Sequence, residues 1–229
     1  MKHFFSLVLV FISIFSFAQR EHHAEIVYGA GKYHSFSGNV VKNFVLLKSD
    51  KLHMGPGVRA LVNFSGKNIP YVTAPHKLTK SDANMDTIRV GKPLLISANI
   101  TLNASYHFTP KFAVGINLDV FGITIGRKKT GTFYPGSASQ NEVIPRKQTP
   151  GVEVKPTLNN IFLAGDRSKG TLASEVFLRY TSKERYNLKV GYSYILTEYA
   201  SKNRVGFDNN YRFRNKAGLF IIGFGYNFI

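Results

Sequence analysis

Apolar and polar side chains alternate along residues 94–125. Successive side chains of a β-strand point to opposite faces, so an alternation with a period of two predicts a strand with one apolar and one polar face. The pattern is interrupted by a turn over residues 109–111 and changes phase after Val120. The segment therefore predicts a long hairpin whose apolar face carries Leu94, Ile96, Ala98, Ile100, Leu102, Ala104, Tyr106 and Phe108, then Phe112, Val114, Ile116, Leu118 and Val120.

The two predicted strands are unusually long. Strands of soluble proteins usually have about 5–6 residues, whereas a strand that crosses a bilayer needs about 9–11 tilted residues with its apolar face toward lipid. Both halves of the hairpin exceed the second figure. This favours a transmembrane β-barrel over a long hairpin in a soluble β-sandwich or lipocalin-like barrel, where the apolar face would point inward.

The same pattern predicts an all-β fold, an eight-stranded antiparallel transmembrane β-barrel. Residues 40–48 are apolar on both parities and could instead form a short amphipathic helix, and residues 210–214 could extend a hairpin and give ten strands. After Val120 the apolar positions shift to Phe121, Ile123 and Ile125, which indicates a β-bulge or a strand that continues above the membrane. The eight predicted strands are residues 24–31, 40–48, 53–65, 94–108, 112–125, 171–181, 186–197 and 217–229.

Short and long connections alternate between these strands. Outer-membrane barrels have short periplasmic turns and longer outer loops, so this order predicts both termini on the periplasmic side. Aromatic residues also gather at the short turns and at the end of the last strand, as a girdle at a membrane interface would. The short connections are 49–51, 109–111 and 182–185, and the long ones are 32–39, 66–93, 128–170 and 198–216. The aromatic residues are Tyr106, Phe108, Phe112, Tyr180, Tyr186, Tyr226 and Phe228.

The N-terminus predicts export. A short basic segment is followed by an apolar stretch over residues 4–17, and Ser16 and Ala18 supply the small residues that a signal peptidase requires. This pattern is typical of a secretory signal peptide, and the apolar stretch is shorter than the ~20 residues of a membrane-spanning helix. We therefore predict a signal peptide over residues 1–18, cleaved after Ala18, and a barrel domain over residues 19–229.

Composition restricts the chemistry. The 229 residues include no cysteine, which excludes disulfides, thiolate metal sites and lipid attachment at an N-terminal cysteine. The formal net charge of +17 would suggest nucleic acid for a cytoplasmic protein. An exported basic chain meets anionic membrane surfaces first, so we predict lipopolysaccharide phosphates and outer-membrane lipids as partners, and no nucleic acid.

With these features the chain resembles the small outer-membrane β-barrel proteins of Gram-negative bacteria, of OmpX or OmpA-domain type. The resemblance covers residues 24–229, and its last strand alternates through Phe220, Ile222, Phe224, Tyr226 and Phe228. The resemblance implies an outer-membrane location, a monomer, and recognition of the last strand by the barrel-assembly machinery, although here Ile229 follows the terminal aromatic residue. The family includes adhesins, structural anchors, narrow pores and a few lipid-modifying enzymes.

The polar residues that alternate with the apolar ones predict a filled barrel interior. An eight-stranded barrel is just wide enough for its own side chains, and isolated charges are costly to bury, so residues of both signs should pair and close the lumen. The predicted interior residues are Glu25, Arg59, Asn99, Asn103, His107, Asn117, Asp119, Glu175, Arg179 and Lys189.

No catalytic, cofactor-binding or metal site is predicted. His34 and Ser35 form the only adjacent His–Ser pair in an outer loop, but neighbouring residues of an extended segment point apart. His22 and His23 lack a third metal ligand. We predict a non-catalytic outer-membrane barrel with long basic surface loops and a structural or surface-binding role toward lipopolysaccharide, polysaccharide or another cell surface. The alternatives are a narrow conduit for small or hydrophobic solutes and a lipid-modifying enzyme.

Overall fold

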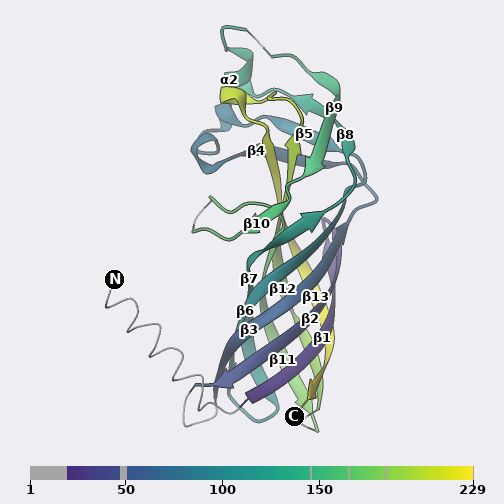
Figure 1. Cartoon of the computed structure of the whole chain (residues 1–229), viewed down its shortest axis with the longest axis vertical. Helices are drawn as coiled ribbons and strands as arrows, with labels where there is room; N and C mark the ends of the chain where they lie inside the picture. The colour runs from purple at the N-terminus through teal and green to yellow at the C-terminus, as the bar shows by residue number, and fades with distance from the viewer. Residues whose placement is uncertain (1–19, 47–50, 145, 165, 184, 229) are drawn as a thin grey trace, which may run out of the picture.

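The chain forms one antiparallel sheet of 13 strands that closes in a ring (Figure 1). A computed structural model describes residues 20–46, 51–144, 146–164, 166–183 and 185–228, and the predicted signal peptide lies outside these residues. Among the described residues, no helix has the length and hydropathy needed to cross a membrane. The sheet has more strands than the eight, or alternatively ten, that the hydrophobic pattern predicts.

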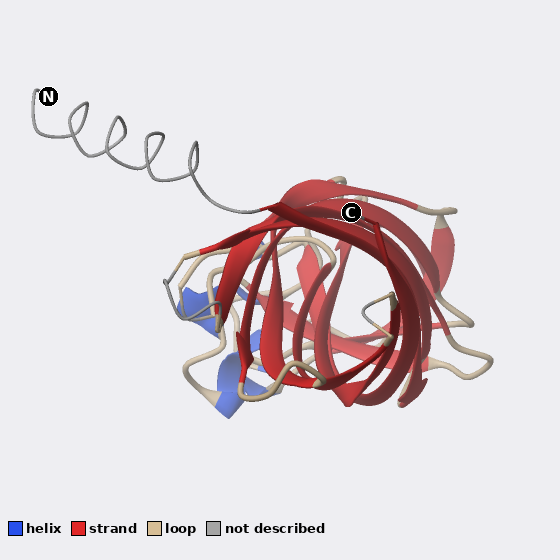
Figure 2. Ribbon diagram, turned by 90° about the horizontal axis from the view of Figure 1, so that it is seen from below, coloured by secondary structure: helices blue, strands red, loops and turns tan. Residues whose placement is uncertain are grey.

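The eight longest strands pair in a closed circuit that we call the lower ring. Figure 2 looks along it from below and shows these strands curving round one circle. The circuit runs β13–β1–β2–β3–β6–β7–β11–β12–β13. Its strands are β1 (Arg20–Gly31), β2 (His34–Val45), β3 (Leu52–Phe64), β6 (Leu94–His107), β7 (Phe112–Ile125), β11 (Leu172–Ser182), β12 (Tyr186–Ser201) and β13 (Arg212–Phe228).

Four short strands join the upper ends of β12 and β13 in a second circuit, the upper ring (Figure 1). It runs β13–β4–β5–β8–β9–β12, and the short β10 pairs with the upper part of β7. These strands are β4 (Ile69–Ala74), β5 (Thr87–Val90), β8 (Lys129–Tyr134), β9 (Thr149–Pro156) and β10 (Asn159–Ile161). The helical turns among them are η1 (His76–Leu78), η2 (Asp82–Asn84), α2 (Ser137–Gln140) and η3 (Phe207–Asn209).

Three of the predicted long loops therefore contain strands, which take up between a third and a half of each. We call residues 66–93, 126–170 and 198–216 the upper segments. The remaining prediction, a polar loop over residues 32–39, is wrong, because β2 begins at His34 and a tight turn joins it to β1. Residues 34–39 contain a single large apolar side chain, Phe36, so their alternation is too weak to be recognised as a strand.

The predicted bulge in β7 is confirmed. Ile100 of β6 pairs with Phe121, whereas the next residue, Thr101, pairs with Asp119. Val120 is therefore the extra residue on β7, and it moves the following apolar side chains to the other parity. Phe121 and Ile123 consequently keep facing outward, with exposed fractions of 52% and 49%.

The two faces of the long strands point as the pattern predicts. Leu102 and Ile116 lie about half exposed on the outside of the lower ring, whereas Asn103 and Asn117 are buried inside it. Water-soluble proteins place their apolar faces inward. The lower ring has the reverse arrangement.

An apolar core fills the upper ring. Tyr71 packs edge-on against Tyr199 with ring centroids 5.0 Å apart, and Phe133 packs edge-on against Phe213 at 6.4 Å. Tyr33, from the turn after β1, reaches into this core and donates a hydrogen bond to the Tyr71 hydroxyl at 3.2 Å. Burial raises the pKa of Tyr33 to about 12, so its hydroxyl stays neutral. The core covers the upper end of the polar interior.

Candidate functional site

Buried charges of opposite sign meet inside the lower ring. Arg59 of β3 is fully buried, and its two terminal nitrogens lie 3.0 Å from carboxylate oxygens of Asp119 on β7 and Glu175 on β11. The neighbouring Asn39 accepts a hydrogen bond from Arg59 Nε at 2.9 Å. The guanidinium group thus bridges three strands that are distant in sequence.

Lys189 extends this network toward β1. Its ammonium lies 2.7 Å from Glu25 and 2.8 Å from Glu175, and Arg179 approaches Glu25 at 3.6 Å. Asn117 donates to Glu175 at 2.9 Å. The network joins three bases to three acids, which neutralises its formal charge and satisfies the condition for burying ions. We call these six side chains, Glu25, Arg59, Asp119, Glu175, Arg179 and Lys189, the ionic plug.

Phe177 packs against the ionic plug, although the alternation did not single it out. Its ring is buried on the inward face of β11, beneath the Lys189 ammonium at 4.5 Å and the Arg179 guanidinium at 5.0 Å, which are cation–π distances. Gly115 on the paired strand makes room for it, since a Cβ there would lie 2.5 Å from the ring. A glycine opposite an inward aromatic residue was the available sequence signal.

Nine of the ten predicted interior residues are buried. The exception is His107, whose ring is partly exposed and stacks on His53 at the lower end, with centroids 4.1 Å apart. The predicted separation of His34 and Ser35 is also confirmed. His34 is exposed beside Tyr28, and Ser35 is buried on the opposite face. Within the described ranges, no three metal-ligating side chains come together.

The upper segments carry most of the positive charge. They contain 18 Lys and Arg residues but only seven Asp and Glu residues. Some of the acids are already paired: buried Glu198 holds Arg212 through two hydrogen bonds of 2.8 and 2.9 Å, and Glu142 holds Arg146 at 2.8 Å. The surface left over is strongly basic.

Asp166 anchors the loop after β10 to β13. Its carboxylate accepts hydrogen bonds from Arg214 at 2.7 Å and Thr79 at 2.7 Å, and it pairs with Lys216 at 2.5 Å. Burial acts to raise the pKa of Asp166, but the hydrogen bonds from Lys216 and Thr79 and the charge of Arg214 outweigh it, so the pKa lies below its usual range.

Acid should therefore release this loop. A carboxyl group with a lowered pKa contributes stability that is complete above its unfolded pKa of about 3.9 and is lost as the pH falls through the folded value. Hydrogen-exchange protection of residues 161–164 and 166–169 should fall in that pH range in the wild type. The Asp166→Asn variant should have lower protection at neutral pH and should lack this acid step. An acid step of equal size in the variant would contradict the assignment.

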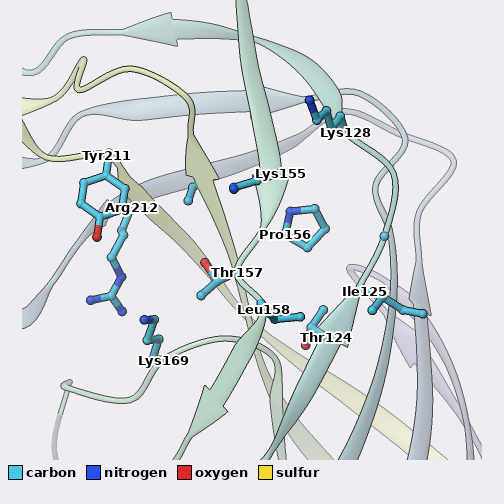
Figure 3. A pocket seen from close by; sticks show the side chains of 12 residues that line it. Thr124, Ile125, Lys128, Lys155, Pro156, Thr157, Leu158, Lys169, Tyr211 and Arg212 are labelled. Carbon is cyan, nitrogen blue, oxygen red and sulfur yellow. The ribbon is translucent and has the colours of Figure 1, made fainter.

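A basic pocket opens where the lower and upper rings meet (Figure 3). Its volume is about 470 Å³, and it lies between the upper end of β7, the β9–β10 connection and the start of β13. Ile125 and Leu158 form part of its apolar wall, and each is more than half exposed. Four cationic side chains line the pocket, and none of its lining residues is acidic: the cations are Lys128, Lys155, Lys169 and Arg212.

Several solved structures are similar to this chain. The N-terminal β-barrel domain of Pseudomonas aeruginosa OprF is 13% identical over 92% of this chain and 99% of that one, with a TM-score of 0.35. The Yersinia pestis outer membrane protein Ail in a phospholipid bilayer nanodisc is 12% identical over 92% and 100%, with a TM-score of 0.36. The Escherichia coli outer membrane protease OmpT is 9% identical over 92% and 94%, with a TM-score of 0.31.

These neighbours are outer-membrane β-barrel proteins, in agreement with the family resemblance drawn from the sequence. No protein-family model matches the sequence, and no curated protein matches it.

Proposed function

We propose that this protein is a non-catalytic, integral outer-membrane β-barrel. Its eight-stranded lower ring would span the bilayer with a closed lumen, and its basic upper segments would bind an anionic cell surface. The observation that carries the proposal is the reversal of faces in the lower ring. Apolar side chains cover its outside while a neutral ionic plug fills its inside, an arrangement that suits lipid and not water.

Aromatic contacts support a membrane interface at the lower end. Phe112 lies 6.1 Å from Phe108 and 5.1 Å from Tyr180, and Tyr226 lies 5.5 Å from Tyr186, all between ring centroids. Aromatic girdles of this kind stand at the boundary between lipid tails and headgroups. In this orientation the short turns face the periplasm and the upper segments face outside.

The proposal includes the route to the membrane. Residues 1–18 would direct export and be removed, and the barrel-assembly machinery would recognise β13, whose outward side chains end in Tyr226 and Phe228. We propose a monomer, because the lower ring is closed by its own strands.

The excess of 18 bases over seven acids in the upper segments supports a surface-binding role. Lipopolysaccharide phosphates and acidic polysaccharides supply counter-charges at the height where these segments would stand. The conduit alternative is weaker, since both the ionic plug and the apolar core occupy the path a solute would need. The lipid-modifying alternative loses the one adjacent His–Ser pair that the sequence offered, because His34 and Ser35 lie on opposite faces.

Cysteine labelling tests the orientation. The chain has no native cysteine, so single Lys80→Cys and Lys111→Cys variants report one exposed position each. On intact cells an impermeant maleimide should label the Lys80→Cys variant alone, and permeabilised cells should label both. Labelling of Lys111→Cys alone on intact cells would reverse the proposed topology.

Planar bilayers test the closed lumen. The wild type should give no stable single-channel currents, because paired charges in a narrow interior leave no continuous water column. Bilayers that receive a known porin from the same preparation provide the positive control. Stable, voltage-independent currents from the wild type would favour the conduit instead.

A further inference from the structure

We propose that the basic pocket between the two rings binds a phosphate group of an outer-leaflet lipid, whose acyl chains lie on the apolar wall below. This inference rests on the membrane location proposed above and adds a defined site to it. The ligand class is a phosphorylated amphiphile, recognised by convergent cations next to lipid-facing apolar side chains.

The charge in the pocket is only partly compensated within the protein. Lys128 pairs with Glu153 at 3.2 Å, and Arg212 pairs with Glu198 at 2.8 Å. Neither Lys155 nor Lys169 makes an ion pair with any residue that the structure describes. Figure 3 shows Lys128 at one end of the pocket and Lys169 with Arg212 toward the other. The pocket therefore holds two positive charges that have no anionic partner among the described residues and can attract an external anion.

A phosphate group fits this arrangement of donors. It presents several strong acceptor oxygens and can take charge-assisted hydrogen bonds from more than one cation at once. Arg212 is held in place by Glu198, which in turn accepts a hydrogen bond from Thr157 in the pocket wall at 2.9 Å. One cation is thus fixed before the ligand arrives, while the two lysines are free to adapt.

The apolar wall identifies the phosphate as part of a lipid. Ile125 and Leu158 line the pocket with exposed fractions of 57% and 58%. Further down β7 the outward side chains of Phe121 and Ile123 continue the same apolar surface, about half exposed. A soluble anion gains nothing from such a wall, whereas a lipid anchored by its phosphate would bury it. The position of the pocket along the barrel axis also fits a lipid headgroup, because the pocket lies directly above the part of β7 that would face lipid.

The test compares two double variants with equal loss of charge. Lys155→Gln with Lys169→Gln removes the two uncompensated pocket cations, and Lys67→Gln with Lys80→Gln removes two exposed cations of the upper segments outside the pocket. Affinity for fluorescently labelled bisphosphorylated lipid A is measured in detergent micelles for each full-length mature protein. The pocket variant should bind about tenfold more weakly, and the control should stay within about twofold of the wild type. Both variants should keep the wild-type urea midpoint.

Two further arms identify the ligand. Lipid A with both phosphates removed should lose affinity for the wild type and should not distinguish the two variants. Inorganic phosphate should compete only at far higher concentration than the lipid. The pocket site would be overturned if both double variants lost affinity equally, or if the pocket variant kept the wild-type affinity. It would also be overturned if the dephosphorylated lipid bound as well as lipid A, or if inorganic phosphate competed at concentrations similar to those of the lipid. None of these results would alter the cysteine-labelling outcome, which tests the membrane topology separately.

Discussion

Replacing Arg59 by alanine should destabilise the protein by about 3–5 kcal/mol, the usual loss when one partner of a buried ion pair is removed. The guanidinium group is fully buried and neutralises two carboxylates, those of Asp119 and Glu175. Lys189 remains near Glu175, but Asp119 would keep only hydrogen bonds from Asn99 and the Ala173 amide. Urea unfolding in lipid vesicles measures the change.

A double-variant cycle separates the ion pair from general damage. Asp119→Ala should be destabilising on its own, and Arg59→Ala with Asp119→Ala should cost less than the sum of the two single variants, because neither charge is then left alone. Lys67→Ala, an exposed change of the same charge, should stay within about 0.5 kcal/mol of the wild type. An Arg59→Ala midpoint equal to the wild type would show that the plug does not depend on this cation.

The alternation predicts the lower ring well because its long strands are apolar on the outer face and polar on the inner face. Every second side chain of a long strand lies on the outer face, which the proposal places against hydrocarbon, and segments such as residues 94–108 show the period without exceptions on that face. The bulge at Val120 and the buried positions of Arg59 and Asp119 follow from the same rule. The ion pairs within the plug cannot be predicted from this rule. They depend on the register between neighbouring strands, which the alternation of apolar and polar residues does not determine.

The strands of the upper ring cannot be predicted from the hydrophobic pattern, for a different reason. Its strands are short and interrupted, as at Pro70 in β4 or Pro150 and Gly151 in β9, so no period develops. Its core gathers side chains from distant segments, including Tyr33 from a predicted loop and Phe133 from the longest predicted connection. The basic pocket is hidden in the same way, because its four cations come from separate segments that meet only in the fold.

Phe213→Ala should open the upper ring while the lower ring stays intact. Phe213 is completely buried and packs against Phe133, and it lies where β13 pairs with both β12 and β4. Truncating a buried phenylalanine usually costs about 3–5 kcal/mol, from lost burial and from the cavity left behind. Neither the ionic plug nor the apolar outer face of the lower ring involves this side chain, so the loss should be confined to the upper segments.

Proteolysis on intact cells at increasing urea concentration measures this effect. Cleavage within the upper segments of the Phe213→Ala variant should begin at a clearly lower urea concentration than in the wild type, while the fragment that contains the lower ring remains protected. Phe220→Ala is the matched control: it lies on the same strand, is 77% exposed and would face lipid. Its cleavage midpoint should equal that of the wild type, because it touches neither core. Equal shifts in the two variants would mean that the upper and lower rings unfold as a single unit.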